Sequence, residues 1–355
     1  MKKNLLRVLA ALLVFCVIFA LLQALLMPKY MENREGALIG EYYDHAGDND
    51  VVFIGDCEVY ENFSPITLWE EYGITSYIRG SSQQLIWQSY YLMEETLKYE
   101  KPDVIVFNVL SMKYDTPEST KEQDQREAYN RMALDGMRWS SSKWNSILAS
   151  LSKEEKENNL SDTMASYIFP LLRYHDRWSQ LTEEDFRYWF KKDQVSDQGY
   201  LMQTGVKPFE TEYAERPLAN YAFGENSYKY LDMMVELCKE NDVELVLVKA
   251  PSMYPIWWDK WEEQMEEYAE KHDLLYINML EHVEDIGIDW SQDTYDAGLH
   301  LNVYGAEKAS RWFGKILTEE CGVKDRREDT TVSAKWAEIC ETYYARKKAM
   351  ELKED

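Results

Sequence analysis

The hydrophobic pattern of the chain begins with a nearly uninterrupted apolar run over residues 8–27. About 20 apolar residues are enough for a helix that crosses a bilayer. The basic residues Lys2, Lys3 and Arg7 precede this run, which favours a cytoplasmic N-terminus with the rest of the chain outside. A cleaved signal peptide is the alternative, but no small-x-small cleavage site follows the run. We therefore interpret residues 1–27 as an uncleaved signal anchor.

Beyond residue 50, short apolar runs alternate with amphipathic patterns of helical period. Alternation of this kind predicts an α/β fold, here a flavodoxin-like parallel five-stranded sheet with helices on both faces. The predicted strands lie at 51–55, 74–80, 103–111, 243–252 and 274–280. The predicted helices lie at 64–73, 83–100, 226–241, 258–272 and 303–320.

The same pattern divides the chain into segments. A short acidic stalk is expected at 28–50, followed by the α/β domain at 51–322. Residues 112–224 interrupt the alternation, and they are too many for a plain loop, so we expect a helical insertion there. The charged tail at 323–355 is expected to form a peripheral helix.

Composition narrows the classes of partner. The net charge of −25 argues against nucleic acid and against direct docking on anionic lipid, because no basic stripe can meet phosphates. The five cysteines are odd in number and far apart, which fits neither a disulfide framework nor a zinc site. We expect no metal and no cofactor.

In a parallel sheet, functional side chains collect at the carboxyl ends of the strands. Several polar residues and one cysteine occupy such positions, and a further group directly precedes the last helix. The candidate site residues are Cys57, Gly80, Asn108, Asp293, Asp296 and His300.

These residues resemble the SGNH, or GDSL-like, hydrolase superfamily. The resemblance consists of Gly-Asp-Cys after the first strand, a Gly after the second, an Asn on the third and the closing block "HLNVYGAEKAS". It covers 51–322 with the insertion unmatched. The anchor and the outside domain further resemble members that work beside membrane-bound O-acyltransferases. Two features depart from the family, which has a Ser where this chain has Cys57 and an acid three residues before its His.

The resemblance implies a site for acyl transfer. Cys57 would be the nucleophile and His300 the base, and the expected pKa of the thiol is depressed by the nearby imidazole. The implied oxyanion donors are the backbone N–H groups of Cys57 and Gly80 and the side-chain amide of Asn108. Each residue also has a plain structural interpretation, such as an inert small thiol at position 57 or a helix-capping role for His300.

Two aspartates compete for the role of the orienting acid. Asp296 lies four residues before His300, and Asp293 lies seven before it. We favour Asp296, because Gly298 can adopt a left-handed conformation that absorbs the extra residue of the turn.

The predicted function is therefore acyl transfer to, or acyl hydrolysis from, a cell-surface glycan. The predicted location is the cell membrane, with a single span and an extracytoplasmic catalytic domain. A membrane-bound O-acyltransferase is the expected protein partner. The alternative is a catalytically inactive SGNH fold that binds a glycan or that acyltransferase.

Overall fold

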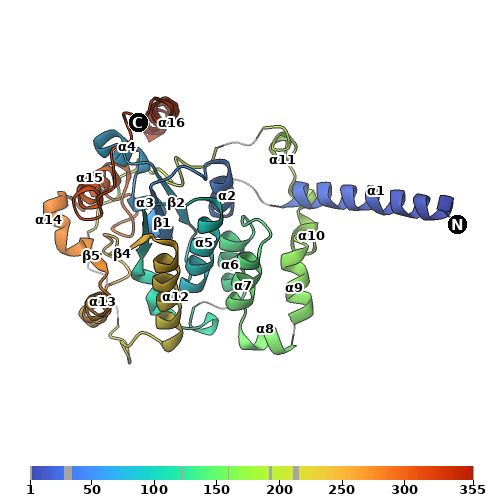
Figure 1. The fold of residues 1–355 in the computed structure, drawn as a ribbon, viewed down its shortest axis with the longest axis horizontal. Helices are drawn as coiled ribbons and strands as arrows, with labels where there is room; N and C mark the ends of the chain where they lie inside the picture. Colours follow the sequence, from blue (N-terminus) through green and yellow to red (C-terminus); the bar gives the residue numbers. More distant parts are fainter. Residues whose placement is uncertain are drawn as a thin grey trace.

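A five-stranded parallel sheet forms the centre of the protein, seen here in a computed structural model that describes residues 2–27, 34–120, 123–158, 160–191, 194–210 and 216–354. The strand order is β2-β1-β3-β4-β5, and each neighbouring pair is parallel (Figure 1). This order confirms the predicted flavodoxin-like sheet. The strands are β1 (Val51–Gly55), β2 (Ser76–Gly80), β3 (Val104–Asn108), β4 (Glu244–Lys249) and β5 (Leu275–Asn278).

Helices cover both faces of the sheet, which is why the central strands β1 and β3 are nearly continuous apolar runs. Along β1, Val51 and Phe53 enter one hydrophobic core, and Val52 and Ile54 enter the other. One face carries α3 (Cys57–Asn62), α4 (Pro65–Tyr72), α14 (Val283–Ile286) and α15 (Val303–Glu319). The other carries α5 (Ile86–Tyr99), α12 (Glu225–Asn241) and α13 (Asp259–His272).

The predicted insertion between β3 and α12 is largely helical. Its first part packs on α5 through a separate small core that includes Leu92 and Ile147. Its last part returns to the sheet, where the Ile78 N–H donates to the carbonyl of Gln198 over 3.0 Å. Its described helices are α6 (Gln123–Leu134), α7 (Ser141–Ser150), α8 (Lys153–Asn158), α9 (Leu160–Ile168), α10 (Leu171–Tyr174) and α11 (Glu183–Arg187). Within the described residues, the 3₁₀ turns are η2 (Tyr42–Asp44), η3 (Val109–Lys113), η4 (Pro117–Ser119), η5 (His175–Gln180) and η6 (Met279–His282).

The segment expected as a stalk is partly built into the domain. Residues 34–41 form α2 (Arg34–Glu41), and Tyr42 after it is fully buried. The hydroxyl of Tyr42 donates to Glu100 over 2.7 Å, and the guanidinium of Arg79 lies 3.8 Å from the centre of its ring. The domain therefore begins near residue 34, within the range assigned to the stalk.

The two ends of the chain are helical. The C-terminal α16 (Thr330–Glu354) packs on α4, where the rings of Trp336 and Trp69 stack with centroids 5.2 Å apart. At the other end, α1 (Lys2–Leu26) projects from the domain (Figure 1). Among the described residues, α1 alone is long and apolar enough to cross a membrane, a test that a signal sequence also passes.

Candidate active site

A short helix at the carboxyl end of β1 carries Cys57. Asp56 caps this helix, α3, by accepting a hydrogen bond from the Glu58 N–H over 3.2 Å. Cys57 is therefore the first residue of a helix, whereas the sequence indicated only a turn. The pattern missed α3 because it has six residues and its adjacent apolar pair, Val59 and Tyr60, shows no helical period.

Gly80 lies against the same turn. A Cβ at this position would come within 2.9 Å of the Tyr60 ring and 3.1 Å of the Gly55 carbonyl oxygen. A side chain at Gly80 would thus push β2 away from the start of α3. The glycine that the sequence singled out is required by this close approach of two backbones.

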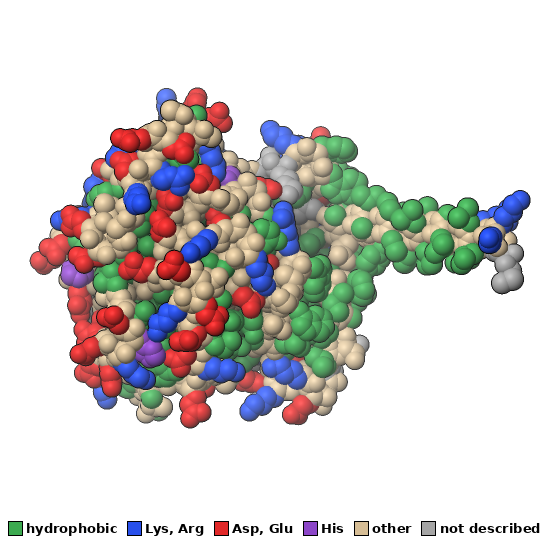
Figure 2. Space-filling model, in the orientation of Figure 1, with side chains coloured by type: hydrophobic (Ala, Val, Ile, Leu, Met, Phe, Trp, Pro, Cys, Tyr) green, Lys and Arg blue, Asp and Glu red, His purple; other side chains and the backbone are tan. Residues whose placement is uncertain are grey.

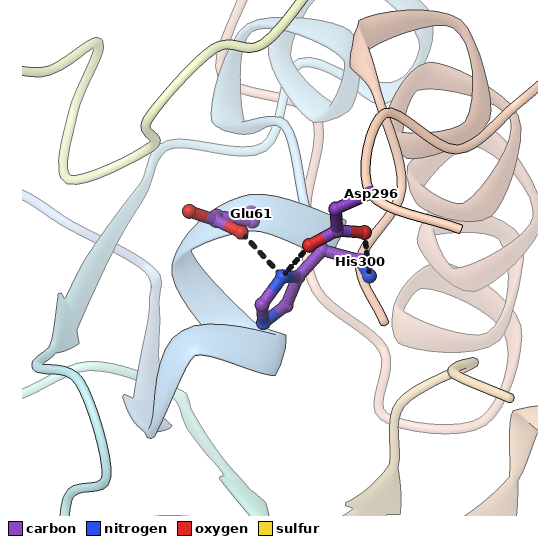
Figure 3. A group of neighbouring side chains, drawn as sticks. All are labelled: Glu61, Asp296 and His300. Carbon is purple, nitrogen blue, oxygen red and sulfur yellow. Dashed lines mark hydrogen bonds and ion pairs between the residues drawn. The ribbon is translucent and has the colours of Figure 1, made fainter. Parts of the chain in front are cut away.

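His300 is held by Asp296 through two hydrogen bonds. Asp296 Oδ2 lies 2.7 Å from Nδ1 of the ring, and Asp296 Oδ1 accepts from the His300 backbone N–H over 2.8 Å (Figure 3). The intervening turn has positive φ at Ala297, +65°, and at Gly298, +91°. The predicted left-handed glycine is confirmed, and it brings the carboxylate back beneath the imidazole.

A second carboxylate, from Glu61, lies on the same ring nitrogen. Glu61 Oε2 is 2.9 Å from His300 Nδ1 and also accepts the hydroxyl of Tyr295 over 2.7 Å (Figure 3). The sequence analysis missed Glu61. Its signal was the spacing of four residues from Cys57, which places both side chains on one face of α3.

Asp293 has a different environment from Asp296. Its Oδ2 accepts the Asp289 N–H over 2.7 Å and pairs with Lys308 Nζ at 2.6 Å. No contact joins it to His300 in the part of the chain that the structure describes. The cap of α15 is Asn302, whose side chain accepts from the N–H groups of residues 304 and 305, so His300 does not cap that helix.

Asn108 is buried, and carboxylates take its amide hydrogens. Its Nδ2 donates to Asp56 Oδ1 over 3.1 Å and to Glu58 Oε2 over 3.0 Å, and its Oδ1 accepts the Ala250 N–H. An amide nitrogen has two hydrogens, so neither is free for an oxyanion in this arrangement. Glu58 is in turn paired with the fully buried Lys249, whose Nζ lies 2.9 Å from Glu58 Oε2.

Burial raises the pKa of the Cys57 thiol, and the nearby His300 offsets this only in part. The negative charges of Asp56 and Glu61 act in the same direction as burial. The expected depressed thiol pKa is therefore wrong. Burial is the largest contribution to the raised pKa, and it outweighs the opposing effect of the imidazole.

The pKa of His300 moves in a direction that favours the imidazolium. Burial alone would lower it, but the negative charges of Cys57 and Glu61 and the hydrogen bond that the ring donates to Asp296 raise it well above the usual range. Nε2 of the ring is buried without a well-aligned hydrogen bond among the described residues. Because Nδ1 is occupied by carboxylates, Nε2 is the nitrogen left to exchange a proton with the Cys57 thiol.

A cation also lies close to this centre. Lys113, at the end of η3, is near enough to Asp56, Glu58 and Cys57 for their charges to raise its pKa, although burial outweighs them and lowers it. The sequence analysis did not select this residue. A positive charge here can stabilise negative charge that develops at the thiol or on a bound carbonyl oxygen.

Glu61, Asp296 and His300 are also the described residues whose ligand atoms, all within 4.8 Å of one another, could hold a small cation. A cation there would bind to Nδ1 in place of the proton that both carboxylates now approach. Direct hydrogen bonds account for these distances, and we interpret the group as an imidazole held by two acids.

Comparison with known proteins finds only distant structural similarities. No protein-family model matches the chain, and no curated protein matches it. A crystal structure of a candidate acylhydrolase from Bacteroides fragilis matches with 11% identity and a TM-score of 0.37, covering 78% of this chain and 91% of that one. A structure of a candidate lipolytic protein of the G-D-S-L family from Desulfitobacterium hafniense matches with 13% identity and a TM-score of 0.35, covering 76% and 100%. Similarity at this level carries no argument about activity.

Proposed function

We propose that the protein is a membrane-anchored acyl esterase or acyl transferase that acts outside the cytoplasm through Cys57. One observation carries the proposal: His300 is held by Asp296 at Nδ1 and its other nitrogen is left for the thiol at the start of α3. A nucleophile, a base and an orienting acid are the parts that acyl transfer requires.

The reaction would proceed through a thioester. In the form with a neutral imidazole, protonated at Nδ1 only, Cys57 Sγ bonds to the acyl carbonyl carbon while its proton moves to His300 Nε2, and the carbonyl becomes an oxyanion. His300 then returns the proton to the leaving oxygen as the carbon–oxygen bond breaks. In the second half, water or a sugar hydroxyl attacks the thioester, His300 accepts its proton, and the thiol is released with that proton.

The oxyanion would be stabilised by fewer donors than the family resemblance implies. The backbone N–H groups of Cys57 and Gly80 are the proposed donors, and Lys113 supplies a nearby positive charge. Asn108 is not a proposed donor, because its amide nitrogen donates to Asp56 and Glu58. Its proposed role is to hold the start of α3 against the sheet.

The substrate that we propose is an acylated cell-surface glycan, with a membrane-bound O-acyltransferase as protein partner. This rests on the resemblance to SGNH proteins of that setting and on the apolar α1 preceded by basic residues. A sugar hydroxyl outside the membrane can accept an acyl group from a thioester. The direction of the reaction then depends on whether water or sugar reaches the thioester first.

A second candidate is a non-catalytic binding module of the same fold. Two observations favour it: the raised pKa of the Cys57 thiol and the occupied amide of Asn108. The two candidates differ in whether an acyl group ever becomes attached to Cys57.

Trapping the acyl group distinguishes them. We would incubate the full-length protein in detergent with p-nitrophenyl acetate and measure intact mass and the modified peptide. Acetylation of Cys57 in the wild type, its loss in Cys57→Ala and its persistence as an oxygen ester in Cys57→Ser are expected. The matched control is Cys238→Ala, which removes a buried thiol and is expected to leave acetylation unchanged. Equal p-nitrophenol release by wild type and Cys57→Ala, with no acetylated peptide, would refute the covalent reaction.

A further inference from the structure

Large apolar side chains are exposed on the part of the insertion next to α1. Trp178 is 71% exposed and Phe190 is 89% exposed, values that are unusual for such residues in a folded domain. Figure 2 shows hydrophobic surface on the side of the domain from which α1 projects. We call this surface the apolar face, and its members are Phe169, Leu172, Trp178, Phe186, Trp189 and Phe190.

The apolar face is attached directly to the last turns of α1. The rings of Phe19 and Phe169 meet edge to face with centroids 5.7 Å apart. Arg177 donates to the carbonyl of Leu26 over 3.2 Å, at the end of the helix where carbonyls lack partners. α10, η5 and α11 all contact α1. The position of α1 in a membrane therefore sets the position of the apolar face.

The depth of the apolar face follows from helix geometry. α1 has 25 residues and is about 37 Å long, which exceeds a hydrocarbon core of about 30 Å. Phe19 precedes the end of α1 at Leu26 by about 10 Å along the helix axis. Its neighbour Phe169 would consequently lie below the head groups, at the depth of about 5–10 Å that interfacial helices reach.

The orientation of the neighbouring helices agrees with such a position. In Figure 1, α9 and α10 run across the direction of α1 rather than along it. With α1 along the bilayer normal, they lie in the plane of the membrane. This is the orientation of a helix that lies in the interface.

Charge indicates which kind of lipid surface the face fits. Between residues 169 and 191, four basic residues are balanced by four acidic ones, and the whole chain carries −25. Attraction to anionic head groups therefore cannot drive the contact. Insertion of the exposed tryptophan and phenylalanine side chains into the lipid can drive the contact, because aromatic side chains partition to the head-group level of a bilayer.

We propose that the apolar face is embedded in the outer leaflet of the same bilayer that α1 crosses, so that the domain lies on the membrane instead of swinging on a tether. This rests on the anchoring part of the proposed function and is independent of the chemistry of Cys57. The occupant of the face is lipid, in contact with Trp178 and Phe190. The position of the insertion then fixes the orientation of the catalytic domain relative to the membrane surface.

Quenching of tryptophan by brominated lipid tests the proposal. The full-length protein would be reconstituted in phosphatidylcholine vesicles whose acyl chains carry bromine near the head group, near the methyl end or not at all. Bromine near the head group is expected to quench most strongly. Trp178→Phe should remove about half of this quenching, because Trp178 and Trp189 are the exposed tryptophans of the face.

The control variant is Trp312→Phe, on α15 at the opposite side of the domain from α1, which should leave lipid quenching unchanged (Figure 1). Added salt should also leave lipid quenching unchanged, since the contact is apolar.

Vesicle flotation distinguishes failure of the embedded face from failure of the membrane anchor. Protein that floats but shows equal quenching in wild type and Trp178→Phe would overturn the embedded face and favour a protein partner there. Protein that does not float would refute the membrane anchor and, with it, the embedded face. The acetylation assay would still test the function of Cys57.

Discussion

Glu61 holds a negative charge against Nδ1 of His300, and replacement by glutamine removes that charge with almost no change of shape. The two side chains are in contact at 2.9 Å and are each less than one-tenth exposed. Two unit charges with centres about 4 Å apart interact by about 4 kcal/mol at an effective dielectric constant of ~20. Reorganisation reduces this, and opposite charges at such distances commonly shift a pKa by about 1–3 pH units.

The sign follows from the two groups that Glu61 faces. Its charge raises the pKa of His300 and also raises the pKa of the Cys57 thiol. Glu61→Gln should therefore lower both values. A neutral imidazole and a thiolate then appear at lower pH, so thiol modification should begin at a lower pH than in the wild type. At a pH below the thiol pKa, each unit by which that pKa falls gives about ten times more thiolate and hence about tenfold faster labelling.

The assay is iodoacetamide labelling of the full-length protein, with the Cys57 peptide quantified by mass spectrometry. The pH is varied from about 5 to about 10, a range that includes the ordinary pKa values of histidine and cysteine. Cys238, which is buried and whose pKa is raised to about 12, serves as the slow internal standard. Glu266→Gln on α13 is the matched control, because it removes an equal charge from an exposed position. A midpoint that stays in place or moves upward in Glu61→Gln would refute the electrostatic interpretation of the site.

Three further substitutions test other parts of the structure. Asp293→Asn should leave esterase activity near that of the wild type and lower the free energy of unfolding in urea by about 1 kcal/mol, since the ion pair of Asp293 is with the half-exposed Lys308. Asp296→Asn should slow acetylation of Cys57 at least tenfold. Equal rates in the two variants would refute Asp296 as the acid that orients His300. Gly298→Ala should lower the free energy of unfolding by about 1–2 kcal/mol, because φ is +91° there and the new methyl would approach Phe209 to 2.9 Å; an unchanged melting temperature would contradict this. Trp336→Ala should cost about 3–5 kcal/mol in one cooperative transition, and a separate early transition would mean that α16 unfolds independently.

The sheet could be predicted because each of its strands is a compact signal in the sequence. β1, β3 and β4 are short apolar runs, and the segments between them have helical periodicity or are too long for a loop. The turn before His300 could also be predicted in outline, because one glycine and one extra residue define it. Local patterns of this kind depend on few residues that are close in sequence.

The surroundings of Cys57 could not be predicted in the same way. The occupied amide of Asn108 depends on Glu58 and Lys249, which come from elements 191 residues apart and meet only in the folded core. No periodicity marks such a buried pair. The thiol pKa was predicted with the wrong sign for a related reason, because burial and two carboxylates could not be weighed against one imidazole without coordinates.

The helix α3 connects both halves of the candidate site through neighbouring positions. Cys57 and Glu61 face the imidazole, and Glu58 is paired with Lys249 beneath. Asn62, its last residue, accepts the Leu301 N–H over 2.8 Å and donates to the Pro251 carbonyl over 3.0 Å. Adding or deleting one residue within α3 would turn everything after it by about 100° and break these links together. Natural variants of this protein should therefore tolerate changes in the length of the insertion far better than any change in the length of this six-residue helix.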